Sequence, residues 1–147
     1  VILTTGQRFG CNLISAITNQ GRLNFMVFKE RFTPPVFLEF LRRLLRQSDR
    51  RIYLIIDNHP VHRSLKVKNW VKENEERLRL VFLPSYSPQI NPDELLNQDV
   101  KSNAVGRQRP GNQTELMCKI RSYLRSRQCK PDIVANYFQG KHVQYAA

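Results

Sequence analysis

Hydrophobic residues recur along the chain with spacings that predict alternating strands and helices. Two β-rich runs, residues 8–18 and 22–29, flank Asn19-Gln-Gly21, which is typical of a hairpin turn. Thr33-Pro34 then predicts a helix start, with a capping residue followed by proline at the first helical position. The apolar spacing after it is helical, with arginines on the opposite face. Its apolar positions are Val36, Phe37, Phe40, Leu41, Leu44 and Leu45.

Two shorter apolar runs, residues 52–56 and 79–83, predict strands that are covered on both faces. A polar helix is expected between them, over residues 63–77, and Pro84 ends the second strand. The order of elements predicts an α/β fold, in which a hairpin and helix-linked parallel strands form one mixed sheet flanked by helices. Further helices are expected over residues 92–104, 113–127 and 131–138.

The charge of the chain narrows the class of partner. Its 147 residues include 24 Lys and Arg against 12 Asp and Glu, a formal net charge of +12. This excess favours nucleic acid, because neutralising phosphates releases condensed counterions. An anionic membrane surface is the alternative partner, but binding to it would require a basic amphipathic helix with a strong apolar face.

Cysteine usage and the first residues bear on the compartment. Cys11, Cys118 and Cys129 are odd in number and share no metal-ligand spacing, so we expect reduced thiols in an intracellular protein. No apolar run approaches the roughly 20 residues needed to span a bilayer. The sequence opens without Met, and we expect it to be an excerpt of a longer protein.

Two acidic residues occupy positions that suit a metal-dependent nuclease. Asp57 ends an apolar run, at the carboxyl end of a predicted strand, where sites form in open α/β sheets. Glu94 lies at the start of a predicted helix. Two-metal phosphoryl transfer requires several carboxylates around two cations about 3.5–4 Å apart, and magnesium prefers such oxygen ligands.

Each acid also has a purely structural interpretation. Asp-Asn pairs commonly begin turns, which accounts for Asp57. Asn91, Pro92 and Glu94 match the N-cap, the first helical residue and the third-position acid of a capping box. The interpretations are compatible, because a carboxylate can cap a helix and bind metal.

Three parts of the sequence together resemble one family. They are Asp57-Asn-His-Pro-Val-His62, Phe82-Leu-Pro-Ser-Tyr-Ser-Pro-Gln-Ile-Asn-Pro-Asp-Glu94, and Lys101. They resemble the second half of the catalytic domain of a DDE transposase of the mariner superfamily, in particular its bacterial insertion-sequence branch. The likeness extends through the hairpin and the helix after Thr33, so residues 1–147 are expected to form a single, N-terminally truncated catalytic domain.

The resemblance implies an RNase H-like fold in which three carboxylates hold two Mg²⁺ or Mn²⁺ ions. It implies cleavage of double-stranded DNA at transposon ends and joining of the 3′ hydroxyl to target DNA. No membrane partner is expected, and a homodimer is a possible assembly. Asp57 corresponds to the second carboxylate and Glu94 to the third, both as catalytic and metal-binding residues. Lys101 corresponds to a lysine that contacts the DNA backbone. The expected location is the bacterial cytoplasm, in association with the nucleoid.

The chain departs from the family pattern in three places. The first carboxylate belongs on a strand before residue 8, but residues 1–29 contain no Asp or Glu. We therefore expect the first strand to be missing and the helix-turn-helix domains to lie upstream. Asn97 replaces a tryptophan that many relatives carry. Asp93 occupies an often aliphatic position, which leaves open that Asp93 rather than Glu94 faces the metal.

Further residues are expected near the site or along the DNA. His62 is expected to hydrogen-bond the loop or to approach a scissile phosphate, and a structural role is equally open. His59 and His62 could form half of a zinc site, but the sequence lacks the ligands that would complete it. The other positions expected beside the site are Asn58, Tyr86 and Asn91. The basic residues that favour a DNA-backbone path over a solvated helix face are Arg107, Arg109, Arg121, Arg125 and Arg127.

Three hypotheses follow. In the first, the chain is the catalytic core of a transposase, and Asp57 and Glu94 hold metals that activate water and then the DNA 3′ hydroxyl for in-line attack. In the second, it is an inactive remnant that holds DNA through charge alone, which the missing first carboxylate favours. In the third, it is an RNase H-like scaffold that mainly dimerises, which requires an apolar patch that the sequence does not reveal.

Overall fold

A computed structural model of the chain describes residues 2–3, 10–84, 91–105 and 111–139. The chain divides into two compact units. Residues 1–31 and 92–147 form the first, here called the hairpin unit, and residues 32–91 form the second, the parallel-strand unit.

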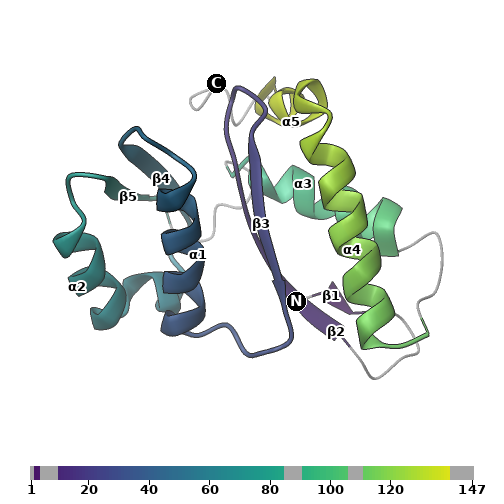
Figure 1. Cartoon of the computed structure of the whole chain (residues 1–147), viewed down its shortest axis with the longest axis horizontal. Helices are drawn as coiled ribbons and strands as arrows, with labels where there is room; N and C mark the ends of the chain where they lie inside the picture. Colours follow the sequence, from purple (N-terminus) through teal and green to yellow (C-terminus); the bar gives the residue numbers. More distant parts are fainter. Residues whose placement is uncertain (1, 4–9, 85–90, 106–110, 140–147) are drawn as a thin grey trace. The chain divides into compact units, whose positions relative to one another are not determined.

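The hairpin unit is built on an antiparallel sheet of three strands in the order β1-β2-β3 (Figure 1). β1 (Ile2–Leu3) pairs with β2 (Gly10–Ile17), which pairs with β3 (Leu23–Phe28). The predicted hairpin is confirmed. Gly21 closes its turn at a φ of +91°, a conformation that favours glycine. A Cβ at this position would also lie 2.3 Å from the carbonyl oxygen of Pro131, so the close approach of α5 requires glycine too.

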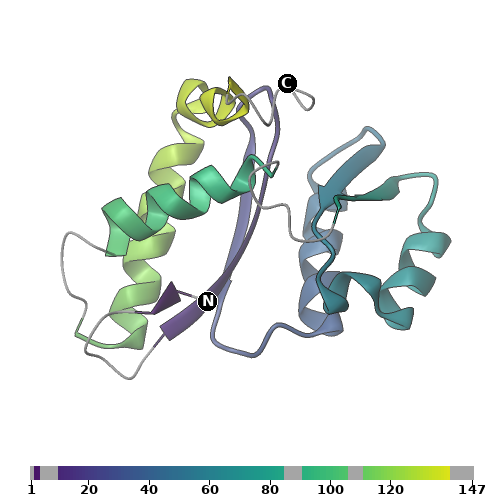
Figure 2. The same ribbon diagram turned by 180° about the vertical axis from the view of Figure 1, so that it is seen from behind.

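Helices pack on this sheet through one continuous apolar core. Leu116, Ile120 and Leu124 recur every four residues along α4 and are fully buried, as expected of a helix with a single core-facing stripe. Figure 2 shows this side of the unit from behind; α3 continues into η3, which packs against α4. The helical segments are α3 (Asp93–Asp99), the π-helical η3 (Val100–Val105), α4 (Gln113–Gln128), α5 (Pro131–Asn136) and the 3-10 turn η4 (Tyr137–Gln139). The core joins them to the strands through Cys11, Leu23, Val27, Leu96, Val100, Leu116, Met117, Ile120, Leu124 and Val134.

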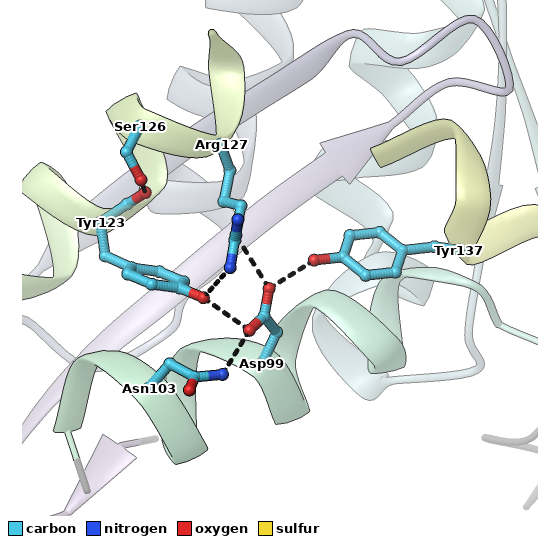
Figure 3. A network of polar contacts seen from close by, with 6 residues as sticks. All are labelled: Asp99, Asn103, Tyr123, Ser126, Arg127 and Tyr137. Atoms are coloured by element: carbon cyan, nitrogen blue, oxygen red, sulfur yellow. Dashed lines mark hydrogen bonds and ion pairs between the residues drawn. The ribbon is translucent and has the colours of Figure 1, made fainter. Parts of the chain in front are cut away.

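A polar cluster centred on Asp99 joins the end of α3 to α4 and η4 (Figure 3). Its carboxylate accepts hydrogen bonds from the hydroxyls of Tyr123 and Tyr137, both at 2.6 Å, and from the amide of Asn103 at 2.7 Å. The guanidinium of Arg127 lies 3.0 Å from the same carboxylate. The Asp99 and Arg127 side chains are only 15% and 17% exposed, so the charges are partly desolvated as well as paired. A satisfied network of this kind rigidifies the elements that it joins.

The surroundings of Asp99 favour its ionised form. Partial burial opposes ionisation, but hydrogen bonds from Tyr123, Tyr137 and Asn103 and the charge of Arg127 together hold the pKa of Asp99 below its ordinary value. A carboxyl whose pKa is lower in the folded than in the unfolded state stabilises the fold above the unfolded pKa. That contribution is lost as the pH falls through the folded pKa.

The parallel-strand unit is built on β4 (Ile52–Ile56) and β5 (Leu78–Phe82), which pair in parallel from Ile52↔Leu78 to Ile56↔Phe82. The remaining elements are α1 (Pro34–Arg46), the 3-10 helix η1 (Pro60–Arg63) and α2 (Leu65–Glu73). The predicted start of α1 at Pro34 is confirmed, although the Thr33 side chain makes no capping hydrogen bond. Its buried residues are Phe37, Leu38, Phe40, Leu41, Leu44 and Leu45, all six members of one helical face.

Several expectations from the sequence need correction. The described strands pair as β1-β2-β3 in the hairpin unit and as β4-β5 in the parallel-strand unit. Strands β4 and β5 are not covered on both faces: the pleat alternates side chains, and Tyr53 and Val81 on one face are 59% and 42% exposed. The short strand β1 was not predicted. Its two residues are apolar, so it supplies no carboxylate.

Helix boundaries also differ. Asn91 is not the N-cap: α3 begins at Asp93 with Pro92 in the capping position, so Glu94 is not the third residue of a capping box. The helix expected over residues 63–77 is shorter, because Ser64 caps α2 and Asn74 ends it. Among the described residues, no helix is long and apolar enough to cross a membrane.

We predict that Asp99→Asn lowers the free energy of unfolding by about 2–3 kcal/mol, because it leaves Arg127 without its partly buried counter-charge. Urea denaturation followed by circular dichroism at neutral pH measures this change. The matched control is Asp49→Asn, the same change at an exposed carboxylate of the other unit. Below about pH 4 the wild-type protein is expected to lose part of the difference. A difference that stays constant down to pH 2 would contradict this account.

Candidate active site

Asp57 lies directly after β4, where the chain leaves the sheet. The strand is held up to this point by the hydrogen bond from the Leu83 N–H to the Ile56 carbonyl, 2.7 Å long. The Asp57 side chain is 58% exposed, and its Oδ1 accepts a hydrogen bond from the backbone N–H of His59 at 3.3 Å. The strand end thus presents a carboxylate to solvent in a fixed turn.

His62 is the side chain that holds this carboxylate. Its Nδ1 lies 3.0 Å from Oδ1 of Asp57 and 3.1 Å from the Asp57 backbone oxygen. Both oxygens are acceptors, so Nδ1 carries the ring proton and donates it. The His62 side chain is only 12% exposed, and its ring packs against Phe37 of α1 with the ring centroids 4.5 Å apart. The core of the unit therefore fixes the partner of Asp57.

These contacts keep Asp57 ionised. The hydrogen bond from His62 lowers the pKa of Asp57 below its ordinary value, and partial burial offsets only some of that effect. A deprotonated carboxylate is the form that binds a cation, and hard oxygen donors are the ligands that magnesium and manganese prefer. Asp57 therefore fits a divalent metal by charge, donor type and exposure.

The His59 side chain caps the 3-10 helix η1. Its Nδ1 accepts a hydrogen bond from the Val61 N–H at 3.1 Å and caps η1. Burial and the neighbouring His62 lower the pKa of His59, which favours the neutral ring that this capping bond requires. Within the described residues, no three His, Cys, Asp or Glu side chains lie close enough together to hold a metal ion.

Glu94 is in the first turn of α3, in the hairpin unit, and is half-buried. Two residues on, the fully buried Leu96 fixes the rotation of this short helix. The neighbouring Asp93 is tied to β2, because the Ser15 hydroxyl lies 2.8 Å from both of its carboxylate oxygens. No pattern along the sequence indicates this contact, which joins residues 78 positions apart.

The structure brings together some of the residues expected near the site. Asn58 follows Asp57 and is half-buried, and Asn91 precedes α3. Tyr86 lies outside the described residues. Asp57 and His62 are in contact, whereas Asp57 and Glu94 belong to different units, each described by itself.

The basic residues that the structure describes separate into three groups. Lys101 on η3 and Arg125 on α4 are exposed, as expected of DNA-contacting side chains. Arg121 is half-buried and donates to the Val27 carbonyl at 3.2 Å, so its guanidinium also packs α4 against β3. Arg127 is bound in the Asp99 cluster, which contradicts its assignment to an open basic path. The sequence could have indicated this pairing, because Tyr123 and Arg127 are one helical turn apart and therefore lie on the same face of α4. Arg107 and Arg109 lie outside the described residues.

We predict that His62→Ala raises the pKa of the Asp57 carboxyl towards its ordinary value, because the largest contribution to the lowered pKa is removed. An NMR titration of the side-chain carboxyl carbons measures the change. Asp99 is the internal control, since its pKa is lowered by contacts in the other unit and is expected to stay low. An unchanged Asp57 titration in a folded variant would show that His62 does not set its charge.

Comparison with known proteins gives consistent matches. Residues 1–117 match the family described as DDE superfamily endonuclease. The insertion element IS630 uncharacterized 39 kDa protein of Shigella sonnei is 29% identical over 109 residues, which are 73% of this chain and 29% of that protein. The chain thus spans less than a third of the length of this relative.

Solved structures match over nearly the whole chain. The catalytic domain of Mos1 mariner transposase has a TM-score of 0.61 at 12% identity, covering 92% of this chain and 80% of that one. The Mos1 strand transfer complex has a TM-score of 0.66 at 16% identity, covering 99% of this chain and 46% of that one. At these identities the likeness concerns the fold, and the predicted RNase H-like α/β class is confirmed.

Proposed function

This chain belongs to the DDE superfamily endonuclease family, and we propose that it is part of the catalytic domain of a DNA transposase that cleaves and joins phosphodiester bonds. The resemblance to DDE transposases of the mariner superfamily, in the insertion-sequence branch, is confirmed by the family match and the relatives together. The activity on transposon ends and target DNA is the proposed part.

The observation that carries the proposal is the exposed, ionised carboxylate of Asp57, which His62 holds at the end of β4. Asp57 and Glu94 are the residues that would bind Mg²⁺ or Mn²⁺. When bound, such ions stabilise the charge that develops on the attacking and leaving oxygens of an in-line displacement. His62 keeps Asp57 deprotonated and oriented for this role. The hydroxyl of Ser15 holds Asp93, which supports Glu94 rather than Asp93 as the metal ligand.

Double-stranded DNA is the proposed substrate. The net charge of +12 supports a polyanionic partner, and one structural neighbour is a Mos1 mariner paired end complex with Mn. Lys101 and Arg125 are exposed, and we propose that they contact the DNA backbone. Arg121 is proposed to contribute charge while it packs on β3. Arg107 and Arg109 are proposed DNA contacts on the basis of the sequence alone.

We also propose that the protein forms a homodimer. Its proposed location is the bacterial cytoplasm, in association with the nucleoid.

A second candidate function is a DNA-binding remnant without activity. It is supported by the net charge of +12, which would hold DNA without any chemistry at a carboxylate. Such a protein would bind DNA with strong salt dependence and would be indifferent to changes at Asp57 and Glu94.

We predict that the full-length protein containing this chain nicks DNA only with a divalent metal, and that Asp57→Asn or Glu94→Gln lowers the nicking rate at least about 100-fold. Conversion of supercoiled to nicked plasmid, with and without Mg²⁺ or Mn²⁺, measures the rate. Asp49→Asn is the matched control for the first variant, because it removes an exposed carboxylate elsewhere in the same unit.

Asp93→Asn separates the two acids of α3. Asp93→Asn is expected to nick DNA within a few-fold of the wild-type rate, because Asp93 is bound by Ser15. Glu94→Gln is expected to nick far more slowly. The reverse ranking would assign the metal to Asp93. Absence of nicking in every protein, with salt-sensitive DNA binding that neither substitution alters, would support the remnant instead.

A further inference from the structure

A groove with a volume of about 430 Å³ lies in the parallel-strand unit, between α2 and β5. One wall is a single face of α2, because Lys68, Val71 and Lys72 are spaced by three and four residues. The other wall is β5, where Leu80 and Phe82 lie on one face of the strand. The groove is therefore built by regular elements rather than by loops.

The floor of the groove is apolar and its rim is cationic. Val71 and Leu80 are half-buried on the floor, and Phe82 is 41% exposed beside them. A large exposed aromatic side chain in a groove offers a stacking surface. The rim carries four exposed basic residues against a single acid, Glu75. The four are Arg51, Lys68, Lys72 and Arg79.

This combination selects a ligand that has a flat apolar face and a row of negative charges. A single-stranded polynucleotide has both, since its bases stack on aromatic side chains and its phosphates attract lysine and arginine. The volume lies in the range of small-molecule pockets, about 300–1,000 Å³, which suits a nucleotide unit rather than a duplex. An acidic peptide would match the rim but would leave the apolar floor without a partner.

The groove also reaches the candidate active site. His62 lines it, and the Nδ1 of His62 lies 3.0 Å from Oδ1 of Asp57. A strand lying in the groove would therefore have its next phosphates beside Asp57.

We propose that the α2–β5 groove binds single-stranded DNA, with a base on the floor at Phe82 and adjoining phosphates at Lys68 and Lys72. The proposal rests on the proposed function, because it takes DNA as the substrate, and it adds the form of DNA that the site holds. The groove would retain an unpaired strand next to the carboxylate that acts on it.

The test measures binding of a fluorescent oligothymidylate by anisotropy, without metal, between about 50 and 200 mM salt. The full-length protein carries either Lys68→Gln with Lys72→Gln, or the matched pair Arg63→Gln with Lys66→Gln. The control pair removes the same charge from exposed positions of the same segment that do not line the groove. The groove pair is expected to lower the slope of log affinity against log salt by about 1.4, from about 0.7 for each of two phosphates, while the control pair leaves it unchanged.

Phe82 tests the base contact. Phe82→Ala is expected to weaken oligothymidylate binding about 5- to 150-fold, the range found for loss of a stacked base. Phe82→Leu retains apolar bulk without an aromatic face and is expected to weaken binding nearly as much. Equal affinity of wild-type protein and both variants would overturn the base contact.

Competitors and the Asp57 variant separate the remaining outcomes. If duplex DNA or polyglutamate displaces the oligonucleotide as well as unlabelled oligothymidylate does, the groove is a general polyanion surface and the proposal is wrong. If the groove pair and the control pair have equal salt slopes, the same conclusion follows. Groove-specific binding that persists in Asp57→Asn, in a protein that never nicks DNA, would overturn the proposed function alone. Nicking without groove-specific binding would overturn this inference alone.

Discussion

The partly buried carboxylate of Asp99 is the contact on which the arrangement of the hairpin unit depends. It stands at the junction of α3 and η3 and is bound from α4 by Tyr123 and Arg127 and from η4 by Tyr137. Apolar packing alone allows helices to slide and rotate, whereas directed bonds to a desolvated charge fix their register. Because Glu94 lies on the same short helix, this cluster also determines where that acid is presented.

A similar arrangement, at smaller scale, governs the other unit. The ring of His62 is packed against Phe37 and bonded to Asp57, so the apolar face of α1 is linked to the charge state of an exposed acid. The two acids are thus supported in different ways: Asp57 by a direct partner in its own loop, and Glu94 through the helix that carries it.

The sequence predicted the elements well where local pattern decides them. The hairpin around Gly21, the start of α1 at Pro34 and the parallel strands followed from turn chemistry, proline geometry and apolar runs. Its errors concern the environment of those elements. Tyr53 and Val81 are exposed although both strands were expected to be covered on both faces. Arg127 is paired although its neighbours on α4 suggested an open basic face. Burial and pairing depend on residues distant in sequence, which periodicity does not record.

The sequence by itself determined the family, the fold class and the identity of Asp57 and Glu94 as the candidate acids, because these follow from residue types at fixed spacing along one chain. Only the tertiary structure decided which side chains act on those acids. The pairing of Ser15 with Asp93, and of Asp99 with Tyr137, joins residues 78 and 38 positions apart. The groove of α2 and β5 likewise exists only where two elements meet. Contacts of this kind arise from folding in three dimensions, and a linear pattern carries no signal for them.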